Sequence, residues 1–123
     1  MKVLLVEPMR HPREIDITPS LEEYYRILDC RCITAVYPWE EPLALVTDDE
    51  GFFTDKLFSR YIPEMGQPIC GSFFLCGLGE ENFADLPPEL MKKFKEKFWN
   101  IQTFIHTKCG LLTVEEVDGT QPQ

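Results

Sequence analysis

The stretch GSFFLCGL at residues 71–78 decides the fold. Its apolar and aromatic side chains follow one another without the polar alternation of a strand that has one face in water. Gly77 and Gly79 interrupt the run, as glycines do at the end of a strand. We therefore expect residues 71–78 to form the central strand of a sheet against which helices pack.

Four shorter runs also have the patterns of strands. They are apolar, alternating or rich in β-branched residues, and turn residues separate them. These runs are residues 2–7, 14–17, 33–37 and 43–47. The first two are expected to form a hairpin across the turn at residues 9–12.

Two segments have the spacing of amphipathic helices. The first is capped by Thr18 or by Ser20, and its expected buried face consists of Leu21, Tyr24, Tyr25 and Leu28. The second starts at residues 87–89 and stops at Gly110, and its expected buried stripe consists of Leu90, Phe94, Phe98, Ile101 and Ile105. Residues 54–68 have neither period, which predicts irregular structure.

The predicted order of elements is β-β-α-β-β-β-α. A chain of 123 residues is typical of one domain, and its hydrophobic fraction of 44% is enough for a core. We predict an α+β fold with a mixed sheet of about five strands and two helices packed on it. Residues 1–110 form the domain in this interpretation, and residues 111–123 form a partly disordered C-terminal tail, with a further strand at residues 111–117 as the alternative.

The charge is strongly uneven along the chain. Residues 1–88 carry sixteen Asp and Glu against seven Lys and Arg, which accounts for the whole net charge of −9. Because this acidic part of the chain repels phosphate backbones, we expect no direct binding of nucleic acid. The chain also has no apolar run of membrane-spanning length and no signal-peptide pattern, which predicts a cytoplasmic protein that does not contact membranes.

The residue types that carry catalysis do not occur in a recognisable arrangement. His11 and His106 have no cysteine or serine partner in a known motif, and there is no glycine-rich phosphate loop with a lysine. Five cysteines without a secretion signal indicate reduced thiols, and the spacing of Cys30 and Cys32 does not suit zinc. We expect no enzyme activity, catalytic residue, metal or cofactor.

The loop at residues 37–42 is the first candidate site. Tyr37 and Trp39 could anchor a partner, because Tyr and Trp bury much area while losing few torsions, and Glu40 and Glu41 add negative charge. The alternative is that Trp39 folds back as a lid on the core.

Arg60 is the second candidate, as the only basic residue between Lys56 and Lys92. It could bind a phosphate or carboxylate of a small ligand, such as a nucleotide, or form an ordinary surface ion pair. A third hypothesis is mimicry of a polyanion, which requires several carboxylate clusters to converge on one face. These clusters are residues 22–23, 40–41, 48–50 and 80–81.

Several separated motifs resemble the family known as domain of unknown function 3846. They are MKVLLVEP at residues 1–8 with Pro12, AVYPWEEPLALV at 35–46, GSFF at 71–74 with GLGEENF at 77–83, and FKEKF at 94–98. The family usually has Gly-Gly where this chain has Cys30-Arg31. Its members are short proteins of phages, plasmids and other bacterial mobile elements, some of them beside modules thought to blunt host defences.

The resemblance and the charge together suggest a function. We expect a non-enzymatic interaction protein of a mobile element that modulates or blocks a host defence protein, using its acidic face against a basic surface. A small-ligand module that binds or sequesters a nucleotide is the alternative. Association of the chain with a second copy of itself is left open.

Overall fold

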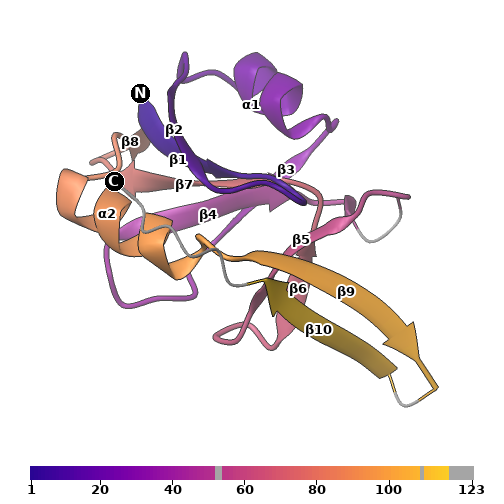
Figure 1. The fold of residues 1–123 in the computed structure, drawn as a ribbon. Coiled ribbons are helices and arrows are strands. Elements are labelled where there is room, and N and C mark those ends of the chain that lie inside the picture. The colour runs from indigo at the N-terminus through magenta and orange to yellow at the C-terminus, as the bar shows by residue number, and fades with distance from the viewer. Residues whose placement is uncertain (52–53, 109, 117–123) are drawn as a thin grey trace.

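The protein is described by a computed structural model that covers residues 1–51, 54–108 and 110–116 (Figure 1). Its main sheet has six strands in the order β2-β1-β7-β4-β3, with the short β8 also pairing with β7. The strands are β1 (Lys2–Val6), β2 (Arg13–Asp16), β3 (Ile33–Val36), β4 (Leu43–Asp48), β7 (Phe73–Leu78) and β8 (Phe83–Ala84). The α+β class and the central position of β7 are confirmed.

Every pairing in the main sheet is antiparallel. The prediction of a mixed sheet is therefore wrong. Short hairpins join β1 to β2 and β3 to β4, which places successive strands side by side in opposite directions. β7 then enters between β1 and β4 and runs antiparallel to both: Leu75 lies opposite Leu4 on one side and Leu45 on the other.

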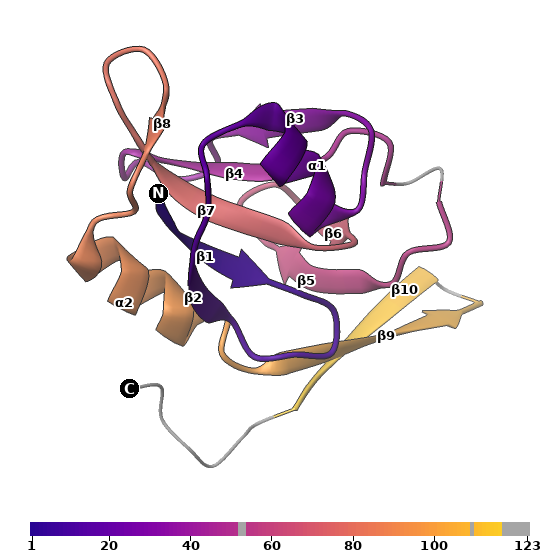
Figure 2. The same ribbon diagram turned by 90° about the horizontal axis from the view of Figure 1, so that it is seen from above.

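The two helices cover opposite faces of this sheet (Figures 1 and 2). α1 (Leu21–Leu28) packs Tyr24 and Leu28 on one face, and α2 (Pro88–Lys97) packs Met91 and Phe94 on the other. Strand side chains alternate between the faces. Residues Val3, Leu5, Ala44, Val46, Phe74 and Cys76 face α1, and Leu4, Val6, Leu43, Leu45, Phe73 and Leu75 face α2.

α1 has the predicted cap and a narrower buried face than predicted. The Ser20 hydroxyl accepts a hydrogen bond from the Glu23 amide at 3.2 Å. Tyr24 and Leu28 are buried, whereas Leu21 in the first turn is 56% exposed. The helix ends at Asp29, whose φ of 50° supplies a left-handed turn just before Cys30-Arg31.

α2 ends earlier than predicted. Its last turn is capped at Phe98, and Ile101–Thr107 forms strand β9 instead of further helix. Ile101, Thr103, Ile105 and Thr107 are all β-branched, which favours an extended chain over a helix. The prediction that the apolar helix stripe continues from Phe98 through Ile101 and Ile105 is therefore wrong.

Two hairpins were not predicted. β10 (Gly110–Glu116) pairs with β9 over its whole length, so residues 111–116 form the strand that was the alternative to a tail; residues 117–123 lie outside the described part. β5 (Phe58–Ile62) pairs with β6 (Gln67–Cys70) in the segment expected to be irregular. A register shift between Phe58 and Tyr61 and a proline in β6 hide the strand alternation there.

The hairpin of β5 and β6 also helps to cover the sheet. Ile62 and Ile69 are buried in the same cluster as Phe94, on the α2 face. That face is therefore covered by a helix and a hairpin together, whereas the described part of the chain places only the short α1 on the opposite face.

Candidate functional site

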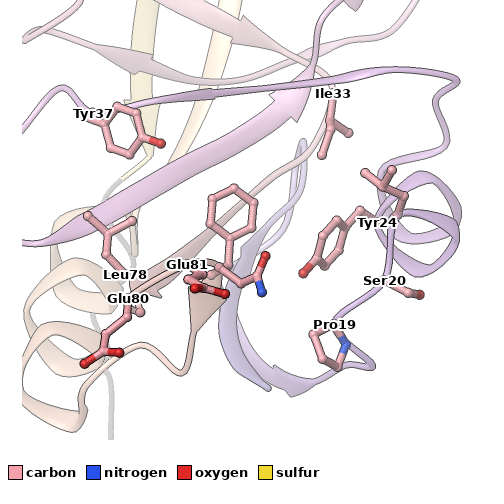
Figure 3. A pocket seen from close by; sticks show the side chains of 12 residues that line it. Pro19, Ser20, Tyr24, Ile33, Tyr37, Leu78, Glu80 and Glu81 are labelled. Atoms are coloured by element: carbon pink, nitrogen blue, oxygen red, sulfur yellow. The ribbon is translucent and has the colours of Figure 1, made fainter.

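A groove with a volume of about 870 Å³ lies beside α1 (Figure 3). We call it the α1 groove. It lies between the N-terminal turn of α1, the edge strand β3 and the loop between β7 and β8 (residues 79–82). Its lining consists of Pro19, Ser20, Leu21, Tyr24, Ile33, Tyr37, Leu78, Gly79, Glu80, Glu81, Asn82 and Phe83.

The position of the groove follows from the short helix. A helix of eight residues is about 12 Å long and about 10 Å wide, whereas five neighbouring strands span about 19 Å. α1 therefore leaves part of its face of the sheet without a second layer. The loop after β7 forms the far wall, projecting from the sheet as Figure 2 shows.

Gly77 fixes where this wall starts. A Cβ atom at residue 77 would lie 2.2 Å from the carbonyl oxygen of Asp85, so only glycine permits the close approach of the returning chain. This approach lets β8 pair with β7, with Phe83 opposite Leu78. The β7–β8 loop is thereby held at the open end of the groove.

The walls of the groove are apolar and open to solvent. Leu21, Tyr37 and Leu78 are 56%, 59% and 44% exposed, and all three line it. Large exposed apolar side chains are unusual when they gather in one place, and such patches mark binding surfaces. The other large exposed apolar residues described are Met9, Leu57, Tyr61 and Ile105, none of which lines the groove.

The rim of the groove is acidic. Glu80 and Glu81 are exposed, and within the described residues neither forms an ion pair. Among the described residues, no lysine or arginine is part of the lining. The groove thus offers apolar contact with negative charge at its edge, and its electrostatic potential disfavours anionic ligands.

Tyr24 adds a polar atom to the groove. Burial, and to a lesser degree the neighbouring Cys76, raises the pKa of the Tyr24 hydroxyl. The ring packs against Phe74 with centroids 5.3 Å apart, and its hydroxyl points toward the open groove (Figure 3). A neutral phenol in this place can donate or accept one hydrogen bond.

The predicted loop at residues 37–42 does not act as one projection. Trp39 lies on the α2 face, where its ring packs against Phe94 with centroids 4.7 Å apart and its Nε1 donates to Glu64 Oε1 at 2.9 Å. Trp39 is therefore the lid that was weighed as the alternative. Tyr37 alone of the aromatic pair reaches the α1 groove.

The two carboxylates of that loop also separate. Glu41 accepts a hydrogen bond from Lys93 Nζ at 2.6 Å, which lowers the pKa of Glu41 and fixes the loop to α2. Glu40 is exposed and does not line the groove. The structure therefore keeps Tyr37 in a candidate site and assigns Trp39 and Glu41 to the packing of α2.

Arg60 lies in the interior, which overturns its placement as a surface anion receptor. Its side chain is fully buried. Its guanidinium donates to the carbonyl oxygens of Phe98 at 3.0 Å, Ser59 at 2.8 Å and Arg10 at 2.7 Å. Arg60 thus joins β5 to the end of α2 and to the turn between β1 and β2.

The acidic clusters do not converge on one face. Glu23 lies on α1, whereas Glu41 is bound to α2 on the opposite face of the sheet. Members of the clusters are also neutralised by cations: Glu23 by Arg26, Glu41 by Lys93, Asp48 by Lys56 and Glu50 by Arg31. This arrangement does not match the single charged face that mimicry of DNA requires.

The cysteines nearest to these carboxylates are not activated. Cys32 Sγ donates to Glu50 Oε1 at 3.1 Å, and this hydrogen bond raises the pKa of Cys32 to about 11. Within the described residues, no three His, Cys, Asp or Glu side chains are arranged to hold a metal ion. This region therefore gives no sign of nucleophilic chemistry.

Sequence reasoning missed most of the groove. Leu21 was predicted to lie on a buried helix face, and the sequence predicted no binding site at residues 79–83. Leu78 could have been noticed, because it continues the apolar run of β7 past Gly77 into a glycine-rich loop. Whether it faces solvent depends on the length of α1 and on the path of β8, which no local pattern specifies.

Comparison with known proteins identifies one family. The family model described as "Domain of unknown function (DUF3846)" matches residues 1–99, which include every residue that lines the α1 groove. No curated protein and no solved structure matches the chain. No helix in the described residues is both long and apolar enough to cross a membrane.

Proposed function

The chain belongs to the DUF3846 family, and from this premise we propose that it is a non-enzymatic interaction protein whose α1 groove binds a host protein. The observation that carries the proposal is the joint exposure of Leu21, Tyr37 and Leu78 around one hollow. In water these side chains gain free energy by docking against an apolar surface, at about 25 cal/mol for each Å² buried. The acidic rim selects a partner with a basic surface.

The biological setting is part of the same proposal. The family resemblance to proteins of phages and other mobile elements suggests a cytoplasmic host protein, such as a defence factor, as the target. Binding through a groove suits blocking, because the occupant loses the surface that it would present elsewhere. The net charge of −9 supports rapid association with a basic target.

The small-ligand alternative has lost its main residue. Arg60, proposed as the contact for a phosphate, is buried against three backbone carbonyl oxygens. The α1 groove has carboxylates at its rim and, as far as the structure describes the chain, no cation in its lining, which is the wrong sign for a nucleotide. Both features favour a protein partner over a nucleotide.

The test compares two exposed leucines, of which one lies in the groove and the other outside it. Leu78→Asp puts a charge in the groove, and Leu57→Asp puts the same charge on a leucine that is 65% exposed outside it. Tagged wild type and both variants are used to retain proteins from a bacterial lysate, after circular dichroism shows that each is folded. We expect the wild type and Leu57→Asp to retain the same protein and Leu78→Asp to lose it.

Two results would contradict the proposal. One is that the wild type retains no protein above background. The other is that Leu78→Asp retains the same protein as well as the wild type does, which would place binding outside the groove.

A further inference from the structure

We infer that the occupant of the α1 groove is an amphipathic α-helix with basic residues along one flank, an inference that rests on the proposed function and specifies its partner. Three features of the groove carry it. They are the pairing of the strands below it, the space beside α1, and the charges at its rim.

Among the described strands below the groove, the inner strands β4 and β7 have no free edge for a peptide strand, and only the outer edge of β3 is unpaired. β4 pairs with β3 on one side and with β7 on the other, and β7 pairs with β4, β1 and β8. The groove is instead lined by apolar side chains such as Ile33, Leu78 and Phe83. An extended peptide lying there would leave many of its N–H and C=O groups without partners, whereas a helix satisfies its own.

The space beside α1 suits a helix. The strands extend about 19 Å across, and α1 covers about 10–12 Å of that distance. On the opposite face α2 shares the covering with the β5–β6 hairpin, so a second element is what the α1 face lacks. An incoming helix would lie between Leu21 on α1 and Leu78 on β7, in the manner of peptides that bind with an apolar face in a groove.

The charge of the incoming helix follows from the rim. Glu80 and Glu81 stand on the loop wall, and Glu22 is exposed next to Leu21 at the start of α1. A helix with lysine or arginine beside its apolar face would pair with these carboxylates, and a helix with acidic flanks would be repelled. Binding should therefore weaken as salt is added.

Synthetic peptides test the inference directly. We would use three labelled peptides of about four helical turns: Leu and Lys at helical spacing, the same composition in strict alternation, and Leu and Glu at helical spacing. Their binding is measured by fluorescence anisotropy against the wild type, Leu78→Asp and Leu57→Asp. A double variant, Glu80→Gln with Glu81→Gln, removes the rim charge. Glu89→Gln with Glu96→Gln removes the same charge from exposed positions on α2.

The expected result is tightest binding of the helical Leu/Lys peptide. We expect Leu78→Asp to weaken it by at least about tenfold, and the rim variant by about threefold to tenfold. Leu57→Asp and the α2 control should change it by less than about twofold. The peptide should also gain helical circular dichroism on binding.

Three outcomes would overturn the inference. If neither Leu78→Asp nor the rim variant weakens binding of the helical Leu/Lys peptide, the peptide is attracted only by the net charge of the protein. No binding of the helical Leu/Lys peptide would exclude the stated occupant. Tighter groove binding of the alternating peptide would replace the helix with a strand while the proposed docking function stands, since the lysate experiment tests that function separately.

Discussion

Tyr37 and Trp39 are separated by one residue, yet they lie on opposite faces of the main sheet. Tyr37 lines the groove on the α1 face and is 59% exposed. Trp39 packs against Phe94 and Phe98 beneath α2. One short loop thus supplies a surface residue to the candidate site and a packing residue to the core.

Substitution of these two residues should separate stability from binding. Trp39→Ala removes the contacts with Phe94 and Phe98 and the hydrogen bond to Glu64, so we expect a loss of about 2–4 kcal/mol in the free energy of unfolding. Tyr37→Ala should change it by less than about 0.5 kcal/mol. Urea unfolding measures both, and equal losses would refute the assignment.

Arg60 should behave as a structural residue. Arg60→Ala leaves the carbonyl oxygens of Phe98, Ser59 and Arg10 without their donor, so we expect a loss of at least about 3 kcal/mol. Arg60→Lys should lose less, because an ammonium group can still reach one carbonyl. The measurement is the urea midpoint of each variant.

A ligand-binding role for Arg60 would give a different pattern. Phosphate or nucleotides would then raise the melting temperature of the wild type through mass action, and the variants would lose that rise. We expect no rise with either compound.

The sequence predicted the main sheet better than the parts around it. Strands 1, 2, 3, 4 and 7 have strong local patterns, and all five lie where they were expected. β9 was mistaken for helix because Ile101 and Ile105 have the same spacing as an apolar helix stripe. Residues four positions apart are neighbours on one face of a helix, and they also lie on the same side of a strand. The spacing alone therefore could not distinguish a helix from a strand here.

The candidate site was less predictable for a physical reason. Arg60 looked like a surface cation because arginine is seldom fully buried, but two of its carbonyl partners, those of Arg10 and Phe98, are far from it in sequence. The groove likewise depends on how much of the sheet α1 leaves uncovered. Both features arise from tertiary packing.

Phe94 tests the docking of α2 on the sheet. It is 1% exposed and contacts the Trp39 ring, so Phe94→Ala should cost about 3–5 kcal/mol and lower the melting temperature. The loss should be the same at low and high protein concentration. An unchanged melting temperature together with lost self-association would show that α2 is an interface between copies of the chain.

Cys32 should react slowly with alkylating reagents. Its pKa of about 11 lies above pH 8, so about one thiol in a thousand is ionised there. Glu50→Ala removes the acceptor and the nearest negative charge, which lowers the pKa and should speed iodoacetamide labelling of Cys32 by at least about tenfold.

The control for this experiment keeps Glu50 and removes its other partner. Arg31→Ala leaves the hydrogen bond from Cys32 to Glu50 in place, so labelling should stay slow. Mass spectrometry of the Cys32 peptide gives the rates. Equal rates in the wild type and Glu50→Ala would show that the carboxylate does not control this thiol.

Photo-crosslinking from single positions tests the docking of a partner in the α1 groove most directly. A photoreactive phenylalanine analogue replaces Tyr37 in the groove or, as a matched control, the exposed Tyr61 on β5. Cells that produce each variant are irradiated, and covalent adducts are detected by their change in mass. We predict an adduct with a host protein from position 37 that Leu78→Asp abolishes, and none from position 61. Crosslinking from position 61 alone, or from position 37 despite Leu78→Asp, would contradict the account.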